Sequence, residues 1–120
     1  MEHYYKNVNG YFDYENIILE AISRVNTTAH FVEVGAFMGK SASFAGVEII
    51  NSGKNIRYDI VDHFLGSEND PAGNNCKDEC VKNIEPVSSV VNLVYLPSVE
   101  AAKLYADNSL DYVFLDGDHN

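Results

Sequence analysis

Short apolar segments alternate along this chain with stretches whose apolar residues recur at helical spacing. Segment 30–34 has the length and near-continuous apolar character of a buried strand. Further strands are predicted over 56–62, which is apolar at its end, and over 90–96 and 112–115. The stretches with the pattern or the end signals of a helix are 11–25, 40–51, 76–84 and 98–105. This alternation predicts βαβ units, and therefore an α/β fold with a mostly parallel sheet.

Two residues are expected to mark helix ends. Asp13 precedes the first helical stretch, where a carboxylate can accept hydrogen bonds from the free amides of the first turn. Gly53 follows the second stretch, where a residue with positive φ commonly ends a helix. We therefore predict that Asp13 caps the first helix and that Gly53 ends the second.

Composition narrows the class of protein. The 120 residues, 46% of them hydrophobic, suffice for one compact core. Eight Lys and Arg against 18 Asp and Glu give a net charge of −10, without the basic cluster that nucleic-acid binding requires. No stretch approaches the roughly 18 apolar residues of a membrane span, and the first residues lack the pattern of a secretion signal. Two cysteines are too few for a disulfide framework, so we expect a cytoplasmic protein. Taken together, these features predict one domain over 1–120 that binds neither nucleic acid nor membrane.

The turn after the first strand is the first candidate site. Gly35 and Gly39 stand four residues apart between a buried strand and a helix, so a ligand could approach the backbone closely. Ligands of parallel sheets bind at this carboxyl end of the strands. Glu33 lies in the apolar strand just before the turn, and burying it costs several kcal/mol without hydrogen bonds or a positive partner. Glu33 is expected either to cap loop amides or to face a cationic ligand.

Two nucleotide-binding motifs match this turn incompletely. The dinucleotide fingerprint fails because Phe37 stands at a glycine position. Gly39-Lys40-Ser41 fits the end of a phosphate-binding loop, but the loop is one residue too short to wrap a β-phosphate with the same amides. A P-loop-like nucleotide hydrolase that uses Lys40, Ser41 and Asp116 is therefore the second hypothesis.

Polar residues also follow the second and fourth strands. Asp62 could accept both hydroxyls of a ribose or cap the following loop, and His63 could flank a planar base or lie at the surface. Asp116 and His119 belong to an Asp-Gly-Asp-His sequence after the last apolar strand. Such a group suits binding of Mg²⁺ or Ca²⁺, or proton transfer by the imidazole.

Cys76 and Cys80 are four residues apart and would share one face of a helix. A zinc site would need two further ligands, and the chain lacks the expected spacing of Cys and His. Buried or half-buried thiols are the favoured interpretation.

Three of these segments, 32–41, 61–64 and 114–119, resemble in order and spacing the class I S-adenosylmethionine-dependent methyltransferases. The similarity is greatest to small-molecule O-methyltransferases with Asp-Gly-Asp-His after the fourth strand, a branch similar in plan to the metal-dependent catechol-type enzymes. It implies a Rossmann-like three-layer sandwich with strand order 3-2-1-4. The cofactor contacts it implies come from Glu33, Gly35, Ala36, Phe37, Gly39, Ser41, Asp62, His63, Ser98 and Asp116.

The resemblance also implies individual roles. Glu33 would face the amino group or sulfonium side of S-adenosylmethionine, and Asp62 would hold the ribose. Ser98 would lie near the adenine edge. Asp116 would occupy a metal position, with Mg²⁺ as the ion, and His119 would be the general base. The acceptor would be a small molecule with a hydroxyl group.

The chain departs from the family in its length. The family sheet has seven strands in the order 3-2-1-4-5-7-6, whereas the predicted strands here stop at the fourth. An open fourth-strand edge would expose unpaired backbone groups, so we expect a homodimer that covers it. A truncated, non-catalytic remnant that folds and dimerises is the third hypothesis.

Overall fold

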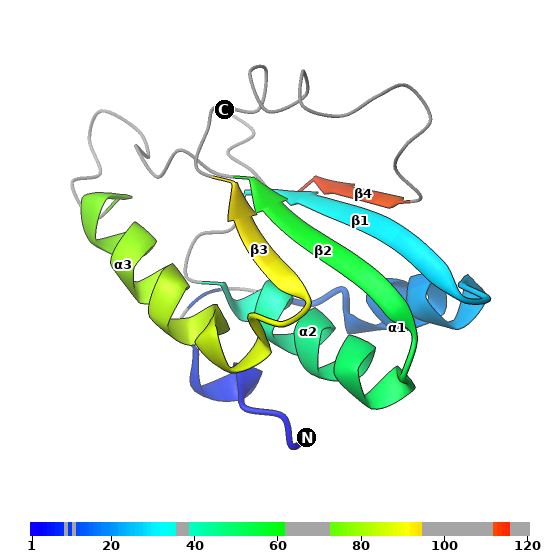
Figure 1. Ribbon diagram of the computed structural model, residues 1–120. Helices are drawn as coiled ribbons and strands as arrows, with labels where there is room; N and C mark the ends of the chain where they lie inside the picture. The colour runs from blue at the N-terminus through cyan, green and yellow to red at the C-terminus, as the bar shows by residue number, and fades with distance from the viewer. Residues whose placement is uncertain (9, 11, 36–38, 62–72, 95–111, 116–120) are drawn as a thin grey trace.

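The computed structural model describes residues 1–8, 10, 12–35, 39–61, 73–94 and 112–115 (Figure 1). Along the chain, the elements are the 3-10 helix η1 (Tyr5–Asn7), α1 (Glu15–Arg24), β1 (Thr28–Val34), α2 (Lys40–Ser52), β2 (Asn55–Val61), α3 (Gly73–Ile84), the 3-10 helix η2 (Glu85–Val87), β3 (Val91–Val94) and β4 (Tyr112–Leu115). The predicted alternation of strands and helices is confirmed for these residues.

The four described strands form one parallel sheet in the order β3-β2-β1-β4. In register, Val34 at the end of β1 pairs with Val61 of β2 and with Leu115 of β4. The ends of these strands therefore lie together at one edge of the sheet, as the arrowheads show (Figure 1). The expected strand order 3-2-1-4 is confirmed.

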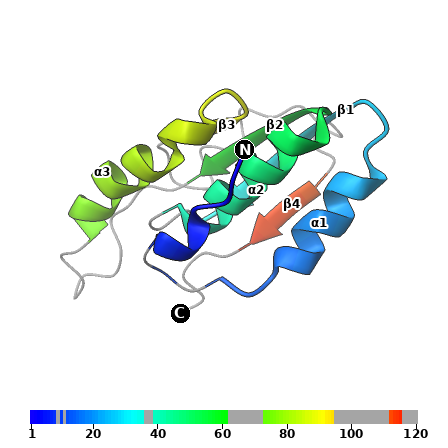
Figure 2. The ribbon, with the colours of Figure 1, turned by 90° about the horizontal axis from the view of Figure 1, so that it is seen from below.

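The described helices α1, α2 and α3 lie on one face of the sheet (Figures 1 and 2). The core between α2 and the sheet contains the fully buried side chains of Phe31, Tyr58, Ile60 and Val47. None of the described helices combines the length and the apolar character that crossing a membrane needs. The helix predicted over 98–105, a candidate for the third layer of the sandwich, lies outside the described residues.

Two helix ends test the predicted signals. Contrary to the prediction, Asp13 is not the N-cap residue of α1: that position is Tyr14, whose side chain makes no capping hydrogen bond. The physical reason is aromatic packing: Phe12 and Tyr14 stack edge-to-face, and Phe12 also packs on Phe44 of α2, so the chain turns into the helix at Glu15. Gly53 does end α2, with φ of +71° and its amide donating to the carbonyl of Ile50.

Candidate functional site

Glycines with positive φ flank the turn between β1 and α2. Gly35 has φ of +95°, and its amide donates to the Val61 carbonyl at 2.8 Å, which ties the start of the turn to the end of β2. Gly39 has φ of +83° at the N-cap of α2. L residues with a side chain rarely adopt such angles, so the backbone explains both glycines. Ala36 and Phe37, also expected to contact a cofactor, lie outside the described residues.

Glu33 lies immediately before this turn and is fully buried, with 0% of its surface exposed. Its carboxylate accepts hydrogen bonds from hydroxyl groups on separate elements. Ser41 Oγ lies 2.7 Å from Oε1 and 2.6 Å from Oε2, and the Tyr58 hydroxyl lies 2.6 Å from Oε1. The Tyr14 hydroxyl is farther away, at 3.5 Å from Oε1. These hydroxyl donors offset the desolvation of the carboxylate.

The hydroxyl partners add to the two alternatives expected for Glu33, which were loop amides and a cationic ligand. Ser41 was expected to contact a cofactor, and the structure shows that its hydroxyl donates to Glu33. Sequence reasoning missed Tyr58. A tyrosine inside an otherwise buried strand, such as Tyr58, is a usable signal because its hydroxyl needs a partner when buried.

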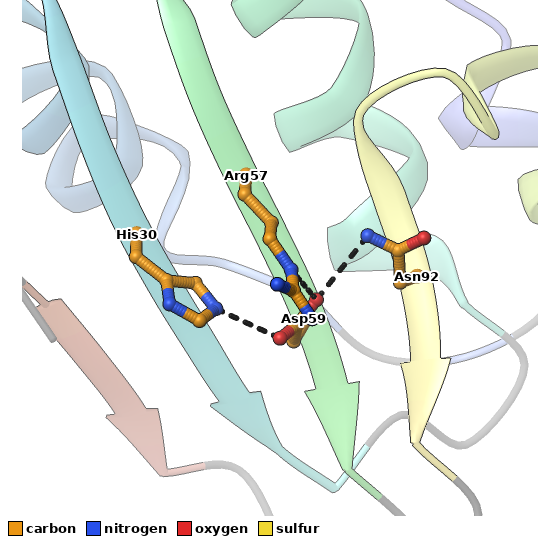
Figure 3. A network of polar contacts seen from close by, with 4 residues as sticks. All are labelled: His30, Arg57, Asp59 and Asn92. Atoms are coloured by element: carbon orange, nitrogen blue, oxygen red, sulfur yellow. Dashed lines mark hydrogen bonds and ion pairs between the residues drawn. The ribbon is translucent and has the colours of Figure 1, made fainter. Parts of the chain in front are cut away.

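A second buried carboxylate lies on the opposite face of the sheet. Asp59 of β2 is 0% exposed, and His30 Nε2 of β1 lies 2.8 Å from its Oδ2. Arg57 Nε donates to Oδ1 at 3.0 Å, and Asn92 Nδ2 of β3 donates to the same oxygen at 3.3 Å. Figure 3 shows how these four side chains join three strands. No pattern in the sequence predicted this network.

The residues of the other hypotheses are only partly described. Lys40 at the start of α2 donates from Nζ to the Gly10 carbonyl at 3.2 Å, so its ammonium group holds the N-terminal segment. Cys80 is a buried free thiol, as favoured, whereas the side chain of Cys76 is not described. Among the described side chains, no group of three His, Cys, Asp or Glu could hold a metal ion.

The remaining predicted site residues follow strand ends that the structure does describe. Asp62 comes directly after Val61 of β2, and Asp116 comes directly after Leu115 of β4. Val61 and Leu115 both pair with Val34 of β1. Asp62, His63, Ser98, Asp116 and His119 themselves lie outside the described residues. The topology thus brings the starts of two predicted site segments to the edge where Gly35 begins its turn.

Comparison with known proteins supports the fold. No protein-family model matches the chain, and no curated protein sequence matches it significantly. Among solved structures, precorrin-6y C5,15-methyltransferase from Geobacter metallireducens matches 96% of the chain with a TM-score of 0.62 and 15% identity. A putative sarcosine dimethylglycine methyltransferase from Galdieria sulphuraria matches 84% with a TM-score of 0.53 and 17% identity. TrmK from M. capricolum, solved with S-adenosyl-homocysteine, matches 88% with a TM-score of 0.50 and 13% identity.

The chain spans 56% of the length of the precorrin-6y methyltransferase, 34% of the Galdieria protein and 41% of TrmK. At these identities the likeness concerns the fold. With its parallel β3-β2-β1-β4 sheet and its glycine turn after β1, the chain has the Rossmann-like fold of class I methyltransferases.

Proposed function

We propose that this chain binds S-adenosylmethionine and forms the cofactor-binding part of a methyltransferase. The observation that carries the proposal is the turn between β1 and α2, which has positive-φ glycines at both ends and lies at the carboxyl edge of the sheet. In parallel α/β sheets this edge is where ligands bind. The fold similarity to methyltransferases, one of them solved with S-adenosyl-homocysteine, supports the choice of ligand.

The described residues of this turn and the strand before it suit such a ligand. The positive-φ glycines leave the backbone of the turn open to close approach, and the buried Glu33 carboxylate one residue away from it favours a cationic group nearby. When bound, S-adenosylmethionine supplies an activated methyl group. The chain would hold the cofactor in line with the acceptor and would take a proton from the acceptor.

The finer assignments are part of the same proposal and rest on the resemblance in the sequence. Asp62 would hold the ribose, and His63 and Ser98 would lie near the adenine. His119 would deprotonate a small-molecule hydroxyl acceptor, and Asp116 would bind a Mg²⁺ ion. A homodimer that covers the exposed edge of β4 is proposed on the ground that β4 pairs with β1 alone among the described strands.

Calorimetry with S-adenosylhomocysteine tests the proposal. We expect saturable binding by the wild-type chain, weakened by Asp62→Ala. ATP or GTP with Mg²⁺, added in a parallel thermal-shift series with Lys40→Ala as the control, tests the nucleotide hydrolase. Stabilisation by a nucleotide that Lys40→Ala abolishes, together with no binding of S-adenosylhomocysteine, would overturn the methyltransferase proposal.

A further inference from the structure

The contact between Glu33 and Ser41 spans the turn of the candidate site. Glu33 is the next-to-last residue of β1, and Ser41 is the second residue of α2. The hydrogen bond between them, at 2.6 to 2.7 Å, spans the seven intervening residues, which include Gly35 and Gly39. The placement of the start of α2 relative to the end of β1 therefore depends on where the Glu33 carboxylate is held.

Tyr58 holds that carboxylate from the neighbouring strand. Its side chain is fully buried, and its hydroxyl donates to Oε1 at 2.6 Å. In the register of the sheet, Tyr58 pairs with Phe31, two residues before Glu33 on the same face. Because β2 is fixed to β1 by seven paired residues, the Tyr58 hydroxyl is a rigid reference point for the carboxylate.

The bond from Tyr58 also supports the charge of Glu33. A hydroxyl that donates to a carboxylate stabilises its ionised form, and such bonds are stronger than those between neutral groups. Ser41 has one proton to donate, so it can bond fully to one carboxylate oxygen at a time. Tyr58 supplies the second short bond, and the Tyr14 hydroxyl at 3.5 Å contributes less.

We propose that Tyr58 is a positioning residue of the cofactor site, which fixes the Glu33 carboxylate and, through Ser41, holds the start of α2 at Gly39 against the end of β1 at Gly35. This inference rests on the proposed binding of S-adenosylmethionine. It adds a residue from inside β2 to those that the resemblance implies.

The test measures S-adenosylhomocysteine affinity for wild type, Tyr58→Phe, Ser41→Ala and the double variant. Tyr58→Phe keeps the ring and removes the hydroxyl. We expect about tenfold weaker binding, equivalent to about 1.4 kcal/mol. If Tyr58 acts through the same carboxylate as Ser41, the double variant should bind no more than about twofold worse than Ser41→Ala alone, because the two losses are coupled. Fully additive losses would overturn the inference.

Tyr4→Phe is the matched control. It removes one part-buried hydroxyl, which donates to the Asn83 carbonyl on α3 rather than to Glu33. Affinity should match wild type within about twofold. Amide NMR shifts of Gly35 and Gly39 should move in Tyr58→Phe and not in Tyr4→Phe, whereas a purely structural role of Tyr58 would lower stability and leave these native-state shifts in place.

The two proposals can fail separately. If wild type binds S-adenosylhomocysteine and Tyr58→Phe binds equally well, the positioning role is wrong and the proposed function stands. If wild type does not bind, the proposed function is wrong. The NMR comparison then decides whether Tyr58 shapes the turn, and unmoved Gly35 and Gly39 signals would overturn that as well.

Discussion

Replacing Gly39 by alanine is expected to destabilise the protein more than the same change at Gly53. The two glycines occupy opposite ends of α2, with φ of +83° and +71° respectively. For a residue with a Cβ, a left-handed conformation costs about 1 to 2 kcal/mol. Both variants should therefore lose stability from backbone strain alone, and by similar amounts.

The space around the new Cβ separates the two variants. At Gly53 nothing lies within 4 Å of a built Cβ. At Gly39 the Cβ would lie 3.0 Å from Ile84 Cγ2 and 3.2 Å from Cys80 Sγ, both on α3. Overpacking of a core costs about 1 to 3 kcal/mol, and contacts this close to the permitted limit place Gly39→Ala at the lower end. We expect it to be less stable than Gly53→Ala by about 1 kcal/mol.

Urea unfolding of both variants and wild type measures this difference. Equal losses would show that α3 moves aside without cost and would refute the packing argument. A larger loss for Gly53→Ala would refute it more directly. If the proposed function is right, Gly39→Ala should also weaken S-adenosylhomocysteine binding, since Gly39 belongs to the turn, while Gly53→Ala should leave the affinity unchanged.

Three further changes have outcomes set by the structure. Gly46→Ala in the middle of α2 should destabilise the protein by about 1 to 3 kcal/mol in urea unfolding, because the new Cβ would lie 2.5 Å from Val87 Cβ. This loss should outweigh the preference of alanine for helices, and a stabilised variant would contradict it. Asp59→Ala should cost about 1 to 3 kcal/mol because it removes the buried acceptor of the hydrogen bonds from Arg57 and Asn92. Arg57→Ala, at a side chain 59% exposed, should cost less than about 1 kcal/mol; similar losses in the two would be inconsistent with this. Burial raises the pKa of Tyr4 above its ordinary value of 10.0. As pH rises, the Tyr4 hydroxyl therefore ionises in the unfolded chain before it ionises in the folded protein. The stability that Tyr4 contributes below pH 10 is lost as pH rises through its folded pKa. Tyr4→Phe should flatten this alkaline loss in urea unfolding at a series of pH values, and unchanged slopes would contradict the assignment.

The strands were the most predictable part of the fold. β4 occupies the predicted residues 112–115, and β1 and β2 differ from the predicted strands by at most two residues at an end. Continuous apolar runs carry this information because a parallel strand is buried on both faces. The strand order came from the family resemblance, since alternation alone predicts a parallel sheet without ordering it.

Contacts between distant residues limited the prediction of the site and of the helix start. Burial cost identified Glu33, but its partner Tyr58 is 25 residues away and comes close through strand register. His30 and Asp59 are 29 residues apart and meet in the same way. At α1, the local signal indicated Asp13 as the N-cap, whereas the N-cap is Tyr14 and Phe12 packs on Phe44. Propensity and spacing describe neighbours along the chain, whereas these contacts depend on packing in three dimensions.

The two fully buried carboxylates differ in the direction of their partners, and this difference separates stability from site. Asp59 is bonded by His30, which lies at the level of Arg57, and by Asn92, which lies at its own level. Its network therefore lies within the strands and away from their carboxyl ends. Glu33 is bonded by Tyr58 within the sheet, but also by Ser41, which lies beyond the end of β1 on the far side of the turn. A change at Asp59 should therefore lower stability with little effect on the turn, whereas a change at Glu33 alters the loop that ligands of a parallel sheet contact.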